Sequence, residues 1–411
     1  MSIRPELAIL KPAIAGAVVC ALLAACNSKQ DAANAAPDAP VLSVPIQRNG
    51  GWVVEAQDAG NKTHRVLLDT GASFNLFEAD GPLAAAPLTT TAGSALLRQG
   101  VLTSSTADAS LTINTLSGAH RIELGLSPAL RVQGWSMPAG ALAFRGKIGR
   151  MASADDQPFD GIIGMENMRN LTWRADHVAG RLTAYANAAP AHAWQQCTFM
   201  TLDTRTRLPL IEFGFDGESN PFILDTGLDS DLLLPQALFD NLRNAKKFPR
   251  VQTVFTTDIT NRVVPRPEGL LAGLTIGQKA MPKLAVRGGS PDLRVGMGLL
   301  EKMDRFELDF RGYRFCFDLP AAPKDSVLTK ANSVLERRGD RYEILALLPG
   351  GRLAESGVKV GDQITMIDEI FVNTLNLAQM SALLSNPATS ELTLRRGNSP
   401  WVVKLTKPKH P

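Results

Sequence analysis

The chain has 411 residues, of which 45% are apolar and 20% are charged, and its formal net charge is +3. This length allows two or three domains, and the composition is typical of a globular protein. Because no long basic run is present, a nucleic-acid partner is not expected.

The N-terminus has the pattern of an exported protein. Arg4 and Lys11 precede an apolar run over residues 12–24, which is short for a membrane span of about 20 apolar residues. The run ends in the letters LAAC, which resemble the bacterial lipoprotein box. The resemblance implies that residues 1–25 are a signal peptide and that Cys26 is lipidated. The alternative is an ordinary secretory signal that happens to contain a cysteine.

The residues after this cysteine indicate a tether and a location. Residues 26–44 are rich in Ala and Pro, so we expect them to form a flexible connection between lipid and folded protein. Bacterial lipoproteins with Asp directly after the cysteine stay in the inner membrane, and this chain has Asn27 there. The resemblance therefore implies a cell-envelope protein that is anchored in the outer membrane and faces the periplasm.

The next part of the chain predicts a mainly β fold made of two related lobes. Short alternating stretches separated by Gly and Asn turns predominate up to about residue 350. The stretch VLLDTG at 66–71 recurs as FILDTG at 222–227, each after a strand-turn-strand pattern. Two later elements also match in the same order, so we expect one lobe over residues 45–190 and a second over residues 191–318.

The repeated Asp-Thr-Gly is the strongest candidate for chemistry. One copy occurs by chance in roughly one chain in ten of this length, but two copies at matched places of a repeat are hard to explain by chance. Each copy follows an apolar strand that would deliver Asp69 or Asp225 at its end. If the two loops face each other, the carboxylates cannot both ionise easily and share one proton. Such a pair can activate a water and protonate a carbonyl oxygen.

At these residues the chain resembles the aspartic proteases, specifically the retropepsin-like group (clan AA). The resemblance covers roughly residues 45–318. It rests on DTGAS at 69–73 and DTGLDS at 225–230, supported by Ile-Ile-Gly at 162–164 and by the looser Arg-Val-Gly at 294–296. It implies a bilobal aspartic-protease-like β fold with both halves of the active site in one chain.

The resemblance also implies a role for each motif residue. Asp69 and Asp225 would form the catalytic dyad, and Asp229 would bind the substrate backbone, with Ser73 also at the substrate. The residues that would support the two active-site loops are Thr70, Gly71, Thr226 and Gly227. No metal ion and no organic cofactor are expected.

Two features depart from the pepsin-type pattern. Ala72 and Leu228 stand where those enzymes usually have Ser or Thr directly after Asp-Thr-Gly. The flap tyrosine has no counterpart, and the candidate flap turns lie near residues 116–118 and 257–258. An alternative interpretation is therefore a folded but inactive relative of the proteases.

Two cysteines remain once the leader and the lipidated cysteine are set aside. Cys197 and Cys316 both lie in strand-like stretches, and an oxidising compartment would allow a disulfide between them. Two buried thiols are the alternative. Neither a C-x-x-C nor an H-E-x-x-H spacing is present, which argues against a zinc site.

The end of the chain changes character. Residues 319–331 are rich in Pro, Ala and Lys and predict a linker to a small α+β domain over residues 332–407. The stretch from Pro349 to the strand after Asp362 resembles the second half of a PDZ domain. This implies a groove for a protein C-terminus, between a strand near 332–337 and a helix over 376–385. The alternative is a rigid domain that packs on the protease.

Together these patterns predict a membrane-anchored aspartic endopeptidase. Its partners would be a polypeptide substrate, the membrane through the lipid anchor, and a protein C-terminus at the PDZ-like groove. It would hydrolyse peptide bonds in envelope proteins or peptides. The alternative is a non-catalytic peptide- or protein-binding lipoprotein.

Overall fold

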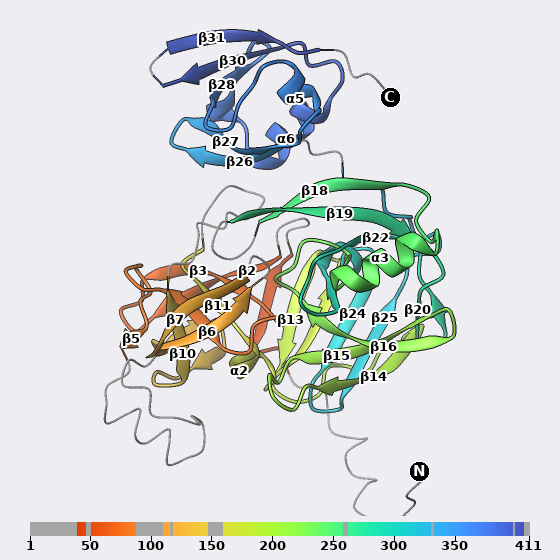
Figure 1. The fold of residues 1–411 in the computed structure, drawn as a ribbon. Helices are drawn as coiled ribbons and strands as arrows, with labels where there is room; N and C mark the ends of the chain where they lie inside the picture. The colour runs from red at the N-terminus through yellow and green to blue at the C-terminus, as the bar shows by residue number, and fades with distance from the viewer. Residues whose placement is uncertain are drawn as a thin grey trace, which may run out of the picture.

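A computed structural model gives the arrangement of the β-rich part of the chain (Figure 1). It describes residues 39–46, 51–87, 110–115, 118–146, 159–257, 262–329, 333–397 and 399–406. Strands predominate in three sheets, which confirms the mainly β fold class. The predicted signal peptide and Cys26 lie outside the described residues. No described helix is long and apolar enough to cross a membrane.

The first half of the chain builds a ten-stranded sheet. Its order is β5-β7-β10-β4-β11-β3-β2-β8-β9, with β6 paired to β7. The strands are β2 (Trp52–Asp58), β3 (Thr63–Leu68), β4 (Asn75–Glu78), β5 (Ala86–Pro87), β6 (Ser110–Thr115), β7 (Gly118–Leu126), β8 (Leu130–Val132), β9 (Trp135–Met137), β10 (Leu142–Gly146) and β11 (Gly161–Ile163). The short helix α2 (Met165–Met168) follows β11.

The second half repeats the central part of this topology. In the first half β11 pairs parallel with β3 and antiparallel with β4, and β10 pairs parallel with β4. In the second half β23, β16, β17 and β22 repeat these pairings. The elements are β15 (Pro209–Phe215), β16 (Glu218–Asp225), β17 (Leu232–Leu233), α3 (Gln236–Asn244), β18 (Val251–Thr257), β19 (Val263–Leu271), β20 (Thr275–Ile276), β21 (Lys279–Ala280), β22 (Leu284–Arg287), β23 (Arg294–Gly296) and α4 (Met297–Leu300).

Six strands join the two halves in one sheet. Their order is β1 (Leu42–Pro45), β13 (Arg181–Tyr185), β12 (Thr172–Asp176), β24 (Arg305–Asp309), β25 (Arg314–Asp318) and β14 (Gln196–Leu202). The first three come from the first half and the last three from the second. Trp52 stacks on Trp173 at 6.0 Å and on Phe306 at 5.6 Å between ring centroids. One apolar core therefore spans both halves.

The tether predicted over residues 26–44 extends too far at its C-terminal end. Strand β1 occupies its last three residues, because Leu42 is fully buried and β1 pairs antiparallel with β13. The expected disulfide is present: Cys197 on β14 and Cys316 on β25 lie opposite each other and are bonded.

The last part of the chain, here called the C-terminal unit (residues 333–397 and 399–406), has a sheet and a core of its own. In Figure 1 it lies beyond the hairpin of β18 and β19. The elements are β26 (Ser333–Arg338), β27 (Arg341–Leu347), α5 (Arg352–Glu355), β28 (Gln363–Ile367), β29 (Ile370–Phe371), η3 (Val372–Thr374), α6 (Leu377–Ser385), β30 (Glu391–Arg396) and β31 (Ser399–Lys404). Helix α6 begins with a capping box between Asn376 and Gln379.

The segment predicted as a linker over 319–331 is bound to the second half at several of its described residues. The Ser326 hydroxyl donates a hydrogen bond to the carboxylate of Asp231. Thr329 donates its backbone N–H and its hydroxyl to the carboxylate of buried Glu268, each at 2.8 Å. These two anchors hold residues 319–329 on the protein surface, so this stretch is not the free connection that its composition suggested.

Candidate active site

Two strands of the repeat bring the predicted aspartates together. Asp69 follows β3, and Asp225 is the last residue of β16. The three residues before each aspartate are apolar and mostly buried, and each aspartate is itself buried, with 8% of Asp69 and 6% of Asp225 exposed. Here the loops at residues 69–75 and 225–231 are called the first and second Asp loops.

Each Asp loop is locked to the other by its threonine. The Thr70 N–H donates to Oγ1 of Thr226, and the Thr226 N–H donates to Oγ1 of Thr70, both at 3.0 Å. Each hydroxyl then donates across the interface, Thr70 to the carbonyl of Leu224 at 2.7 Å and Thr226 to that of Leu68 at 2.8 Å. Both threonines are fully buried, so these four bonds fix the two loops at one separation.

The glycines allow the close approach. A Cβ added to Gly71 would lie 2.3 Å from Cγ of Asp225, and one added to Gly227 would lie 2.5 Å from Cγ of Asp69. Each glycine also donates its N–H to the aspartate of its own loop, at 2.7 Å for Gly71 and 3.1 Å for Gly227. Any side chain at either glycine would therefore displace the aspartate of the opposite loop.

A second pair of glycines packs behind the loops. Gly164 lies against the carbonyls of Ala72 and Phe74, and Gly296 against those of Leu228 and Ser230. The next residue in each case donates its N–H to the loop, Met165 to Ala72 at 2.8 Å and Met297 to Leu228 at 2.7 Å. These matched contacts make Gly164 and Gly296 structural counterparts. Ile162 and Arg294, two residues earlier, are therefore counterparts as well.

The two carboxyl groups interact directly. Burial, and next the charge of Asp225, raise the pKa of Asp69 to about 8 from 3.8, while the N–H of Gly71 and the charge of Arg294 act in the opposite direction. The pair can therefore hold one proton at neutral pH. In the described residues no group of His, Cys, Asp or Glu could hold a metal ion.

Arg294 is the one member of the site that the motifs do not indicate. Its Nη1 lies 2.7 Å from Oδ2 of Asp225, and only 15% of its side chain is exposed. As part of the loose Arg-Val-Gly segment, it was expected only to pack behind the loop. Comparison of the two repeats could have found it, because the counterpart position holds the buried apolar Ile162.

The predicted substrate residues lie on the same two loops. Ser73 is partly buried, and its carbonyl accepts a hydrogen bond from the N–H of Glu166. Asp229 is 84% exposed, and its Oδ1 lies 3.4 Å from Nη1 of Arg287. Their roles toward a substrate stay predictions. The predicted flap turns lie mostly outside the described residues, at the ends of the β6–β7 and β18–β19 hairpins.

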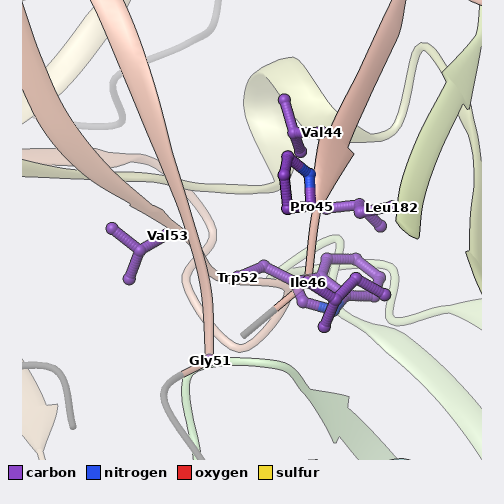
Figure 2. A pocket seen from close by; sticks show the side chains of 7 residues that line it. All are labelled: Val44, Pro45, Ile46, Gly51, Trp52, Val53 and Leu182. Atoms are coloured by element: carbon purple, nitrogen blue, oxygen red, sulfur yellow. The ribbon is translucent and has the colours of Figure 1, made fainter. Parts of the chain in front are cut away.

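A small hollow lies elsewhere, between β1, β2 and β13 (Figure 2). It is lined by Val44, Pro45, Ile46, Gly51, Trp52, Val53 and Leu182. Neither aspartate lines it, and no charged side chain is among its walls. It therefore has none of the groups that the site at the Asp loops brings together.

Comparison with known proteins adds no identification. No family model matches the chain, and no curated protein matches it significantly. A functional assignment must therefore rest on the geometry of the Asp loops.

Proposed function

We propose that the protein is an aspartic-type endopeptidase whose dyad is Asp69 and Asp225. The observation that carries this proposal is the reciprocal hydrogen bonding of Thr70 and Thr226 between two matched loops. That bonding holds two buried carboxyl groups side by side, each beside the glycine of the opposite loop. Keeping two acids in contact is costly for stability, so a chemical role is the simplest reason for building the site.

The proposed reaction is addition of water to a peptide carbonyl. The ionised carboxylate takes a proton from a water molecule while the water oxygen bonds to the carbonyl carbon. The protonated carboxyl gives its proton to the carbonyl oxygen, which produces a tetrahedral diol. When the diol collapses, the carbon–nitrogen bond breaks, the amine leaves with the proton that the first carboxylate took from water, and a hydroxyl of the diol returns a proton to the other carboxylate. No covalent intermediate with the protein forms.

The pH range follows from the shared proton. The raised pKa of Asp69, at about 8, keeps that group protonated at neutral pH. Activity should therefore fall as the pH rises through about 8, because the proton donor is lost. The measurement is a rate profile between pH 4 and 10.

The context of this activity is also a proposal. A lipid on Cys26 would anchor the enzyme in the outer membrane, facing the periplasm, where envelope proteins or peptides are its substrates. The C-terminal unit would act as a PDZ-like module that takes a protein C-terminus. In support, β26 is an edge strand, and α6 packs beside it close to the predicted ranges.

The test is cleavage of an unbiased peptide library by the protein and by three variants. Asp69→Asn and Asp225→Asn should each lose cleavage by at least a thousandfold. Asp216→Asn is the matched control, because this exposed acid lies in the turn between β15 and β16 and pairs with Lys247. Retention of full activity by either dyad variant would contradict the proposal.

A second candidate is a peptide-binding protein without turnover. The ion pair of Arg294 with Asp225 favours it, since a cation on one carboxylate could hold the site closed to water. A peptide carrying a tetrahedral hydroxyl in place of the scissile carbonyl separates the two functions. An active dyad should bind it at least a hundredfold more tightly than the matched peptide. Equal affinities, together with no cleavage, would favour the binding protein.

A further inference from the structure

The two halves of the site match in backbone but not in charge. Ile162 in the first half is buried in a small apolar cluster with Leu67 and Leu76. Its counterpart in the second half is Arg294, whose guanidinium reaches the dyad. The symmetry of the repeat is therefore broken at this side chain, which contacts a carboxyl group of the dyad.

The contacts of Arg294 identify its main counter-ion. Nη1 lies 2.7 Å from Asp225, which is buried, whereas Nη2 lies 3.5 Å from Asp292, whose side chain is 50% exposed. A shorter contact in a drier place is the stronger one. Among the described residues Nε has no hydrogen-bond partner. The guanidinium is thus held mainly through Asp225.

The other charged groups near the second Asp loop have partners of their own. Asp229 faces Arg287, and Asp231 faces Lys302 at 3.5 Å and accepts from Ser326. The charged groups at the dyad are therefore Arg294 on β23 and the two dyad carboxyls, and Asp292 is the second partner of Arg294. With one proton on the dyad, Arg294 balances the single negative charge that remains.

We propose that Arg294 is a positioning residue that assigns the negative charge of the dyad to Asp225 and leaves Asp69 as the proton carrier, and that it thereby sets the pH range of the site. The proposal rests on the proposed endopeptidase function for its catalytic meaning. Asp225 is then the base that takes the proton from water. Asp69, which has no ion pair with a cation among the described residues, is the acid that protonates the carbonyl oxygen.

A buried cation in contact with a carboxylate lowers the pH at which a proton is released, typically by about one to three pH units. Removing the charge should therefore move both limbs of the pH–rate profile to higher pH by that amount. At a fixed pH on the acid limb, the rate should fall about tenfold for every pH unit that the limb moves. A purely structural role for Arg294 would lower the whole profile without moving its limbs.

The experiment compares the full chain in detergent with Arg294→Met and Arg294→Lys. Met keeps the length of the side chain without its charge, and Lys keeps the charge. Two readouts are recorded from pH 3 to 10: peptide cleavage, and the infrared band of protonated carboxyl groups. The infrared spectra are taken as differences against the Asp69→Asn, Asp225→Asn double variant, so that the dyad alone contributes. Melting midpoints show whether each variant is folded.

We expect the Arg294→Met variant to show both limbs of the pH–rate profile, and the infrared titration of the dyad, at a pH about one to three units higher than in the original protein. The Arg294→Lys variant should titrate close to the original protein. If the infrared titrations of the original protein and the Arg294→Met variant coincide, the proposal is overturned, whether or not cleavage is seen. If the infrared titration moves but no protein cleaves any peptide, the charge assignment stands and the endopeptidase function falls. If cleavage occurs but its limbs stay in place, Arg294 does not set the pH range.

Discussion

The proton shared by the dyad has a consequence for stability that Asp69→Asn measures. The folded protein keeps a proton on Asp69 up to a pH of about 8, whereas the unfolded chain releases it near 3.8. Between these values the unfolded state binds fewer protons, so the free energy of unfolding falls as the pH rises. Each pH unit corresponds to about 1.4 kcal/mol, and the roughly three pH units between pH 4 and pH 7 give about 4 kcal/mol.

Asn cannot release this proton, so Asp69→Asn should be more stable than the original protein at pH 7 by up to about 4 kcal/mol. At pH 4 the two should be similar. The assay is urea unfolding at unit steps between pH 4 and 8, with Asp216→Asn as the control for loss of an acid elsewhere. If the curves of the original protein and Asp69→Asn run parallel across this range, the shared proton does not exist.

Three further predictions concern the frame of the site. Thr70→Val removes one donor and one acceptor in a dry interface, so it should cost about 2–4 kcal/mol of stability and abolish cleavage. Thr201→Val on the exposed side of β14 should change neither, and an equal loss there would contradict this reasoning. Gly71→Ala should lower cleavage at least a hundredfold, because the new methyl group would overlap the carboxyl of Asp225, and a rate within threefold of the original would show that the loops can separate. Reduction of the disulfide, which closes 119 residues, should lower the free energy of unfolding by about 5 kcal/mol, as measured by urea unfolding with and without reductant. An unchanged midpoint would mean that the pairing of β14 with β25 in the sheet is enough to fix these strands against each other.

The duplicated motif predicts the centre of the site because it repeats a complete local design. An apolar strand, an acid, a hydroxyl and a glycine recur in the same order, and each threonine and each glycine makes the same contacts in both halves. The apolar segment behind each loop is also identified, through the glycines at 164 and 296. A local pattern of this kind determines the conformation of its own loop, so two copies are enough to expect that Asp69 and Asp225 lie side by side.

Arg294 shows what such reasoning misses. The tripeptide Arg-Val-Gly fits the apolar-apolar-Gly pattern only loosely, and the pattern assigns it no more than packing. A charged side chain in a buried position needs a partner, and the nearest acid across the parallel pairing of β16 and β23 is Asp225. An arginine at a position where the pattern has an apolar residue is therefore the sequence feature that could have indicated Arg294.

Strand β1 and the segment 319–329 escape prediction for a different reason. Strand β1 ends a stretch rich in Ala and Pro, and residues 319–329 contain Pro, Ala and Lys, so both have the composition of a linker; their order comes from partners distant in sequence. Leu42 lies on a strand that pairs with β13, and Thr329 is held by buried Glu268. Neither contact can be inferred from the short stretches that contain these residues.

The anchored segment decides where the protein can be divided. Cutting the chain after residue 318, where the second lobe was expected to end, would remove Ser326 and Thr329 and leave Asp231 and Glu268 with fewer partners in buried surroundings. Asp231 belongs to the second Asp loop, so the damage would reach the dyad. A shortened protein should therefore retain at least residue 329. Any fusion or truncation that removes this stretch together with the C-terminal unit would also remove contacts that hold the second Asp loop in place.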